Sequence, residues 1–120
     1  MSEIEVSEYI AADGSNYYRK WFDKLDVSVA RKVETAIVRL SNGNTSNVKW
    51  FDGIGEYKIN WGPGYRIYLA RDGEHIIVLF GGGKKKRQSS DIAKAIALHK
   101  EYVAFLGCIR EKRVTWPVVL

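Results

Sequence analysis

The fold is decided by residues 54–91, which read IGEYKINWGPGYRIYLARDGEHIIVLFGGGKKKRQSSD. Apolar and polar residues alternate from Tyr57 to Trp61, which is the period of a strand with one face on a core. Gly62-Pro63-Gly64 is typical of a tight turn, so a return strand is expected over residues 65–70. Pairing Trp61 with Tyr65 places the apolar residues of both strands on one face. The other face is then shared by Lys58, Asn60, Arg66 and Tyr68.

A second hairpin is predicted at Asp72-Gly73, a dipeptide typical of two-residue turns. With Arg71 opposite Glu74, the register adds Ile76, Val78 and Phe80 to the same apolar face. The run HIIVLF is apolar on both faces, which suits a central strand, with a short buried helix as the alternative by periodicity alone. It is expected to end beside the start of the preceding strand. The glycine run and the basic residues after it then lie beside Arg66, so that five cations converge: Arg66, Lys84, Lys85, Lys86 and Arg87.

The remaining segments predict an α+β domain. We expect a strand within residues 3–10, a short helix after the cap residues 13–16, and a second helix that begins at Asp26 or Ser28 and ends at Asn42-Gly43. A short strand or edge segment follows at residues 49–51. A last helix runs from residues 89–91 to Gly107, with Ile92, Ile96, His99, Val103 and Leu106 on one stripe. This order predicts a small antiparallel twisted sheet with an N-terminal helical hairpin and a C-terminal helix packed on one face, over residues 1–107, and a C-terminal extension over 108–120.

Length and composition exclude several classes of protein. The 120 residues suffice for one domain, and the net charge of +5 is compatible with nucleic acid or an acidic partner. A single cysteine, Cys108, excludes an internal disulfide framework. The acidic N-terminus is not expected to be a signal peptide, and no apolar run approaches the roughly 20 residues of a membrane span, so we expect a cytoplasmic protein without membrane association. His75 and His99 lack metal-ligand spacing, and His99 is interpreted as a packed core histidine.

The basic cluster indicates binding of a phosphate diester. The run from Lys84 to Arg87 follows three glycines and precedes a helix N-terminus, two features that favour a bound anion, although a solvated loop is the alternative interpretation. Cleavage of RNA needs no protein nucleophile, metal or cofactor, because the substrate's 2′-hydroxyl attacks. The candidate catalytic residues are Lys58, Arg66 and Lys85. Tyr68 is a candidate to stack on a base. The other candidate RNA-binding residues are Lys49, Asn60, Lys84, Lys86, Arg87 and Gln88.

Four segments together resemble a known family. They are WFDKL at 21–25, ARKVETAIVRLSNGN at 30–44, KWFDGIGEYKINWGPGYRIY at 49–68 and GGGKKKRQSSDI at 81–92. This combination resembles the addiction-module killer proteins of the RelE/ParE superfamily, the HigB-like toxins of type II toxin–antitoxin systems. The likeness covers residues 18–106. Its most specific part is the spacing between the GPGYR turn and the paired glycines that precede Lys85.

The resemblance implies a toxin that cleaves mRNA in the translating ribosome. It also implies neutralisation by a cognate antitoxin, here expected to be a helix-turn-helix DNA-binding protein. By position, Arg66 matches the family's strand arginine, Lys85 the lysine after the paired glycines, and Lys58 the basic residue before the turn. Lys84 stands where the family usually has an acid. Two alternatives remain open: a ParE-like inhibitor of DNA gyrase without nuclease activity, and an inactive partner-binding domain of the same fold.

Overall fold

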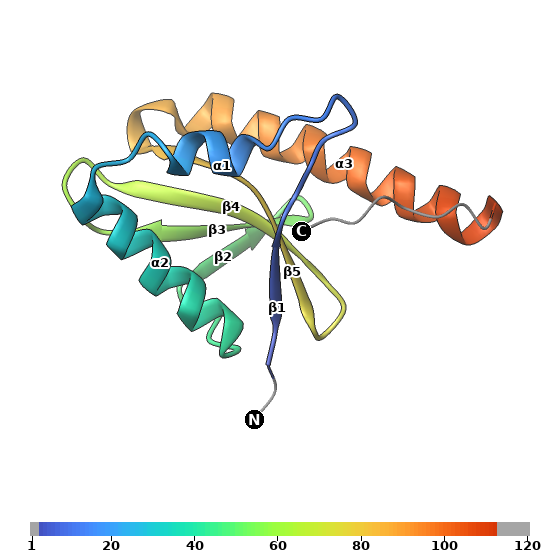
Figure 1. Cartoon of the computed structure of the whole chain (residues 1–120), viewed down its shortest axis with the longest axis horizontal. Helices are drawn as coiled ribbons and strands as arrows, with labels where there is room; N and C mark the ends of the chain where they lie inside the picture. Colours follow the sequence, from blue (N-terminus) through green and yellow to red (C-terminus); the bar gives the residue numbers. More distant parts are fainter. Residues whose placement is uncertain (1–2, 113–120) are drawn as a thin grey trace.

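The computed structural model describes residues 3–112, with side chains described for residues 3–106. A single sheet of five strands in the order β1-β5-β4-β3-β2 forms its centre (Figure 1). The strands are β1 (Glu5–Glu8), β2 (Val48–Phe51), β3 (Ile54–Ile59), β4 (Tyr65–Asp72) and β5 (Ile76–Lys84). The helices are α1 (Tyr17–Phe22), α2 (Val27–Ser41) and α3 (Gln88–Lys112), with a short 3₁₀ turn, η1 (Lys85–Arg87), before α3. The predicted α+β class is therefore confirmed.

The sheet is mixed, so the prediction of a wholly antiparallel sheet is wrong. Strands β2 to β5 pair antiparallel in chain order, whereas β1 runs parallel to β5, with Glu5 opposite Ile76 and Glu8 opposite Leu79. Alternation within a strand does not encode its direction relative to a distant partner. The long connection between β1 and β5 also leaves ample chain for a parallel pair.

Helices cover both faces of the sheet, whereas the sequence pattern predicted one covered face. Helices α1 and α2 pack on a cluster that includes Tyr57, Ile67 and Leu79. Helix α3 covers the opposite face, on a cluster that includes Tyr68 and Phe80. In Figure 1, α2 and α3 accordingly lie on different sides of the strands. The central position predicted for the doubly apolar strand β5 is confirmed.

The first hairpin keeps the predicted faces with a different register. Ile59, not Trp61, pairs with Tyr65, so the register differs by two residues and each side chain keeps its face. Trp61 lies in the turn, where its amide donates to the Ile59 carbonyl oxygen and its side chain is 43% exposed. The expectation that Trp61 belongs to the core is therefore wrong.

The second hairpin has a three-residue loop instead of the predicted two-residue turn. Asp72 pairs with Ile76, and Arg71 donates to the carbonyl oxygens of Gly73 and Glu74 in the loop. One additional loop residue exchanges the faces of the following strand. Ile77 and Leu79 consequently face α2, whereas Val78 and Phe80, which were predicted there, face α3.

The glycine run belongs to β5 and is not a loop. Gly81, Gly82 and Gly83 lie opposite Tyr68, Ile67 and Arg66, after a register shift between Tyr68 and Leu69. A Cβ atom at Gly82 would lie 2.4 Å from the Trp21 ring, and one at Gly83 would lie 2.0 Å from Asp91 Oδ2. The missing side chains therefore let a tryptophan and a carboxylate approach the strand from opposite faces.

The predicted helix starts are mostly confirmed, whereas the predicted end of the C-terminal helix is wrong. The side chain of Asn16 caps α1 by accepting from the Arg19 amide, and Gly43 follows α2 with a positive φ of 85°. Asp26 occupies the cap position of α2 without a side-chain bond. Helix α3 continues through Gly107 to Lys112, beyond the predicted end.

The buried face of α3 differs in part from the predicted stripe. Ala95, Leu98 and Tyr102 are buried, whereas Val103 is 50% exposed. His99 packs edge-on against Phe80 with ring centroids 5.9 Å apart, which confirms its packed position. Residues 113–120 of the expected C-terminal extension lie outside the described residues. Within the described chain, no helix has both the length and the apolar character needed to cross a membrane.

Candidate functional site

All three candidate catalytic residues line one cavity at the tip of the β3–β4 hairpin. The cavity has a volume of about 290 Å³. The turn between the strands forms one wall, and the start of η1 forms another, because the Lys85 amide donates to the Gly64 carbonyl oxygen at 3.1 Å. The lining residues are Lys58, Asn60, Trp61, Gly62, Pro63, Gly64, Arg66 and Lys85.

Arg66 and Lys85 meet beside Gly64, although they are far apart in sequence. A Cβ atom at Gly64 would lie 3.7 Å from Lys85 Cβ and 3.8 Å from Arg66 Nη1. Lys58 pairs with Arg66 across the β3–β4 ladder, so its side chain leaves the same face. Lys58 and Lys85 are exposed, whereas Arg66 is only 4% exposed. The cavity therefore has two exposed amines at its rim and a buried guanidinium at its base.

Arg66 is paired with an acid that the sequence analysis did not select. Its Nε lies 3.4 Å from Glu56 Oε2, and Glu56 is itself only 6% exposed. The same carboxylate oxygen accepts a 2.8 Å hydrogen bond from Gln88 Nε2. Arg66 Nε and Nη1 are buried without a hydrogen-bond acceptor in the described structure. The guanidinium is thus oriented by Glu56 but retains donors for a ligand.

Three other predicted cations line a second, larger cavity. This cavity has a volume of about 500 Å³ and lies along the part of β5 that extends beyond β1. Lys84, Lys86 and Arg87 contribute positive charge, and Trp21 and Asp91 lie against the glycines. The predicted convergence of five cations is therefore correct for Arg66 and Lys85 only, since the other three face a different cavity.

Asp91 is a half-buried acid beside these cations. Its Oδ2 has no hydrogen-bond partner in the described structure. Burial raises the pKa of the Asp91 carboxyl, and the charge of Arg87 opposes that shift. An acidic residue in the first turn of α3 also complements the helix dipole.

The remaining predicted RNA-binding residues lie outside both cavities. Lys49 is exposed on the edge strand β2, opposite Glu56. Gln88 contacts Glu56 as a supporting residue. Tyr68 is 1% exposed beneath α3, and burial raises the pKa of its phenol. A base cannot stack on a ring in that position, so the expectation for Tyr68 is wrong.

The chemistry that the described residues offer is that of fixed positive charge. In the part of the chain that the structure describes, no group of three or more His, Cys, Asp or Glu side chains is placed to hold a metal ion. Glu56 was missed although strand alternation puts it on the same face as Lys58. The alternation of β3 therefore indicated the position of Glu56, but the ion pair between Glu56 and Arg66 depends on the register of β3 and β4.

Comparison with known proteins identifies a relative of undescribed activity. A Haemophilus influenzae protein, described as an uncharacterized protein, is 36% identical over 86 residues, which cover 70% of this chain and 87% of that protein. The chain belongs to the same family as this protein. No protein-family model and no solved structure matches the chain. The family is thus shown by sequence, and its activity has to be argued from the site.

Proposed function

We propose that this protein is a RelE-like, HigB-like toxin of a type II toxin–antitoxin system, which cleaves mRNA on the translating ribosome. One observation carries the proposal: a buried arginine with unpaired donors lies at the base of a cavity whose rim holds two exposed lysines, Lys58 and Lys85. The resemblance around the GPGYR turn and the paired glycines supports the same function. Ribosomes and mRNA are then its targets, a helix-turn-helix antitoxin its neutralising partner, and the cytoplasm its location.

The cavity supplies the groups that RNA cleavage needs. The 2′-hydroxyl loses a proton and attacks phosphorus, the bond to the 5′ oxygen breaks, and that oxygen gains a proton. Arg66 would stabilise the additional negative charge on the phosphate, a contribution of about 3 to 4 kcal/mol for a well-placed donor. Lys58 and Lys85 would transfer the two protons, because both amines line the same cavity as Arg66.

The test compares Lys58→Ala and Lys85→Ala with the exposed control Lys100→Ala. All three lysines are exposed, so none of the changes should impair folding. We expect each cavity variant to reduce mRNA cleavage on translating ribosomes by about 10²-fold or more, and the control to retain it. Intact mRNA on ribosomes treated with the unaltered protein would contradict the nuclease proposal.

The ion pair between Arg66 and Glu56 favours a second candidate. A guanidinium whose charge is partly matched by Glu56 attracts a phosphate less strongly, which suits a ParE-like inhibitor of DNA gyrase without nuclease activity. Accumulation of relaxed plasmid on expression, with translation unaffected, would select this candidate. Unchanged growth with tight antitoxin binding would instead indicate an inactive partner-binding domain.

A further inference from the structure

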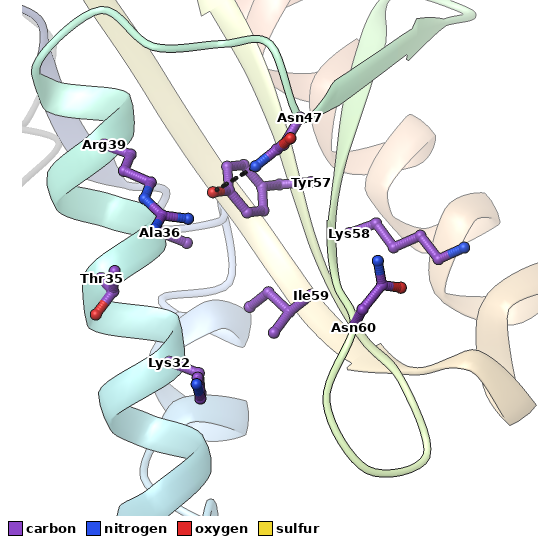
Figure 2. Close-up of a pocket in the computed structure, with 9 residues that line it drawn as sticks. All are labelled: Lys32, Thr35, Ala36, Arg39, Asn47, Tyr57, Lys58, Ile59 and Asn60. Carbon is purple, nitrogen blue, oxygen red and sulfur yellow. Dashed lines mark hydrogen bonds between the residues drawn. The ribbon is translucent and has the colours of Figure 1, made fainter.

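A third cavity lies on the other side of the β3 edge, between α2 and β3. It has a volume of about 300 Å³, and its walls come from α2 and from the end of β3, where Tyr57 is the last residue paired with β2. Figure 2 shows Tyr57 and Ile59 pointing from β3 toward α2. The residues that line it are Lys32, Thr35, Ala36, Arg39, Asn47, Tyr57, Lys58, Ile59 and Asn60.

The charge of this cavity is positive and uncompensated. Lys32 and Arg39, two turns apart on α2, both line it, and no acidic residue does. Within the described residues, neither side chain forms an ion pair. Lys32 Nζ instead lies 4.6 Å from the centroid of the Trp61 ring. Such cations repel one another unless an anion lies between them.

Tyr57 adds a preorganised neutral donor. Its side chain is 3% exposed, and its hydroxyl accepts a 3.3 Å hydrogen bond from Asn47 Nδ2 (Figure 2). A phenol both accepts and donates, and among the described residues no hydrogen bond uses the Tyr57 proton. Because Asn47 fixes the hydroxyl on the cavity wall, that proton is available to an anion held by Lys32 and Arg39.

The cavity between α2 and β3 (the α2 cavity) adjoins the proposed active site. Lys58 and Asn60 line both cavities. In Figure 2, the Lys58 side chain leaves β3 on the side away from α2, so the free edge of β3 forms the ridge between the two cavities. Trp61, whose ring makes the cation–π contact with Lys32, lines the active-site cavity. A chain of phosphates crossing this ridge would meet positive charge on both sides.

We propose that the α2 cavity is a second phosphate subsite, in which Lys32, Arg39 and Tyr57 bind the backbone of the same single-stranded RNA whose scissile phosphate lies at Arg66. The inference rests on the proposed function for its substrate class. In this arrangement Lys32 and Arg39, on the side of α2 that borders the cavity, hold the strand beside the bond that is cleaved.

The experiment measures binding of a short fluorescent single-stranded oligoribonucleotide by anisotropy over a series of salt concentrations. Loss of two phosphate contacts lowers the slope of log affinity against log salt by about 1.4 for a single strand. We expect this change for Lys32→Gln/Arg39→Gln, with at least tenfold weaker binding at low salt. Tyr57→Phe should weaken binding about tenfold without changing the slope, because it removes a neutral donor.

The matched control is Arg31→Gln/Lys100→Gln, which removes the same charge from exposed positions outside the cavities. An equal loss in both double variants would overturn the inference, because net charge alone would then explain it. Failure of the unaltered protein to bind the oligoribonucleotide would overturn it as well. Salt-dependent binding that requires Lys32 and Arg39, in a protein that leaves mRNA intact, would refute the nuclease and retain the subsite.

Discussion

Two charged side chains, Arg66 and Glu56, are buried together beneath α3, and they determine how the site has to be tested. Both are less than 10% exposed, and Gln88 from α3 completes the hydrogen bonding of the carboxylate. Removal of Arg66 would leave Glu56 charged and unpaired in a low-dielectric environment. A loss of activity in such a variant could therefore come from lost catalysis or from impaired folding. Lys58 and Lys85 are exposed, so their replacement tests catalysis without affecting folding.

Arg66→Ala should destabilise the protein by about 3 to 5 kcal/mol, the usual cost of removing one partner of a buried ion pair. Lys58→Ala, at the paired and exposed position on β3, should change the free energy of unfolding by less than about 0.5 kcal/mol. Chemical denaturation measures both. Adding Glu56→Gln to Arg66→Ala should recover part of the loss, because no unpaired charge remains. Equal stabilities of the two single variants would show that the ion pair contributes nothing.

At the scale of the element, patterning predicted which strands exist but not how turns set their faces. The hairpin at residues 62–64 kept its faces because the register differed by an even number of residues, and Lys58, Asn60, Arg66 and Lys85 consequently came together as predicted. The β4–β5 hairpin has one more loop residue than predicted, so the side chains of β5 lie on the opposite faces from those predicted. Alternation cannot detect that difference in a strand that is apolar on both sides, such as β5.

The glycines of β5 make a second element-scale prediction. Gly82→Ala would force its Cβ into the Trp21 ring and displace α1, so we expect a cost of about 1 to 3 kcal/mol in denaturant unfolding. Gly81→Ala is the matched control, since a Cβ atom there meets nothing within 4 Å. The control should be neutral or slightly stabilising, because alanine has less conformational entropy to lose. If both variants unfold alike, the close approach of Trp21 does not explain the glycine.

At the scale of the whole molecule, α3 is held on its face of the sheet by apolar packing and by hydrogen bonds between residues far apart in sequence. Glu101 accepts from Tyr9 Oη at 2.5 Å and from the Ala12 amide at 2.9 Å, which ties the segment after β1 to the helix. Tyr102 donates to Asp72 at the far end of β4. Sequence periodicity predicted the helix, but it gave no information on these partners, which are separated by 30 to 92 residues.

His99 makes the packing of this layer sensitive to pH. Burial against the sheet lowers the pKa of its imidazole, so the unfolded chain binds a proton more readily than the folded one. The stability that the neutral His99 imidazole contributes to the folded state is fully present above the unfolded pKa of about 6.5. It is lost as the pH falls through the lower pKa of the folded state. The free energy of unfolding should therefore decrease more between about pH 7.5 and 5.5 in the unaltered protein than in His99→Gln. His75→Gln, at the exposed loop histidine, should behave like the unaltered protein. Parallel pH profiles for all three proteins would show that α3 packs without excluding a charged imidazole.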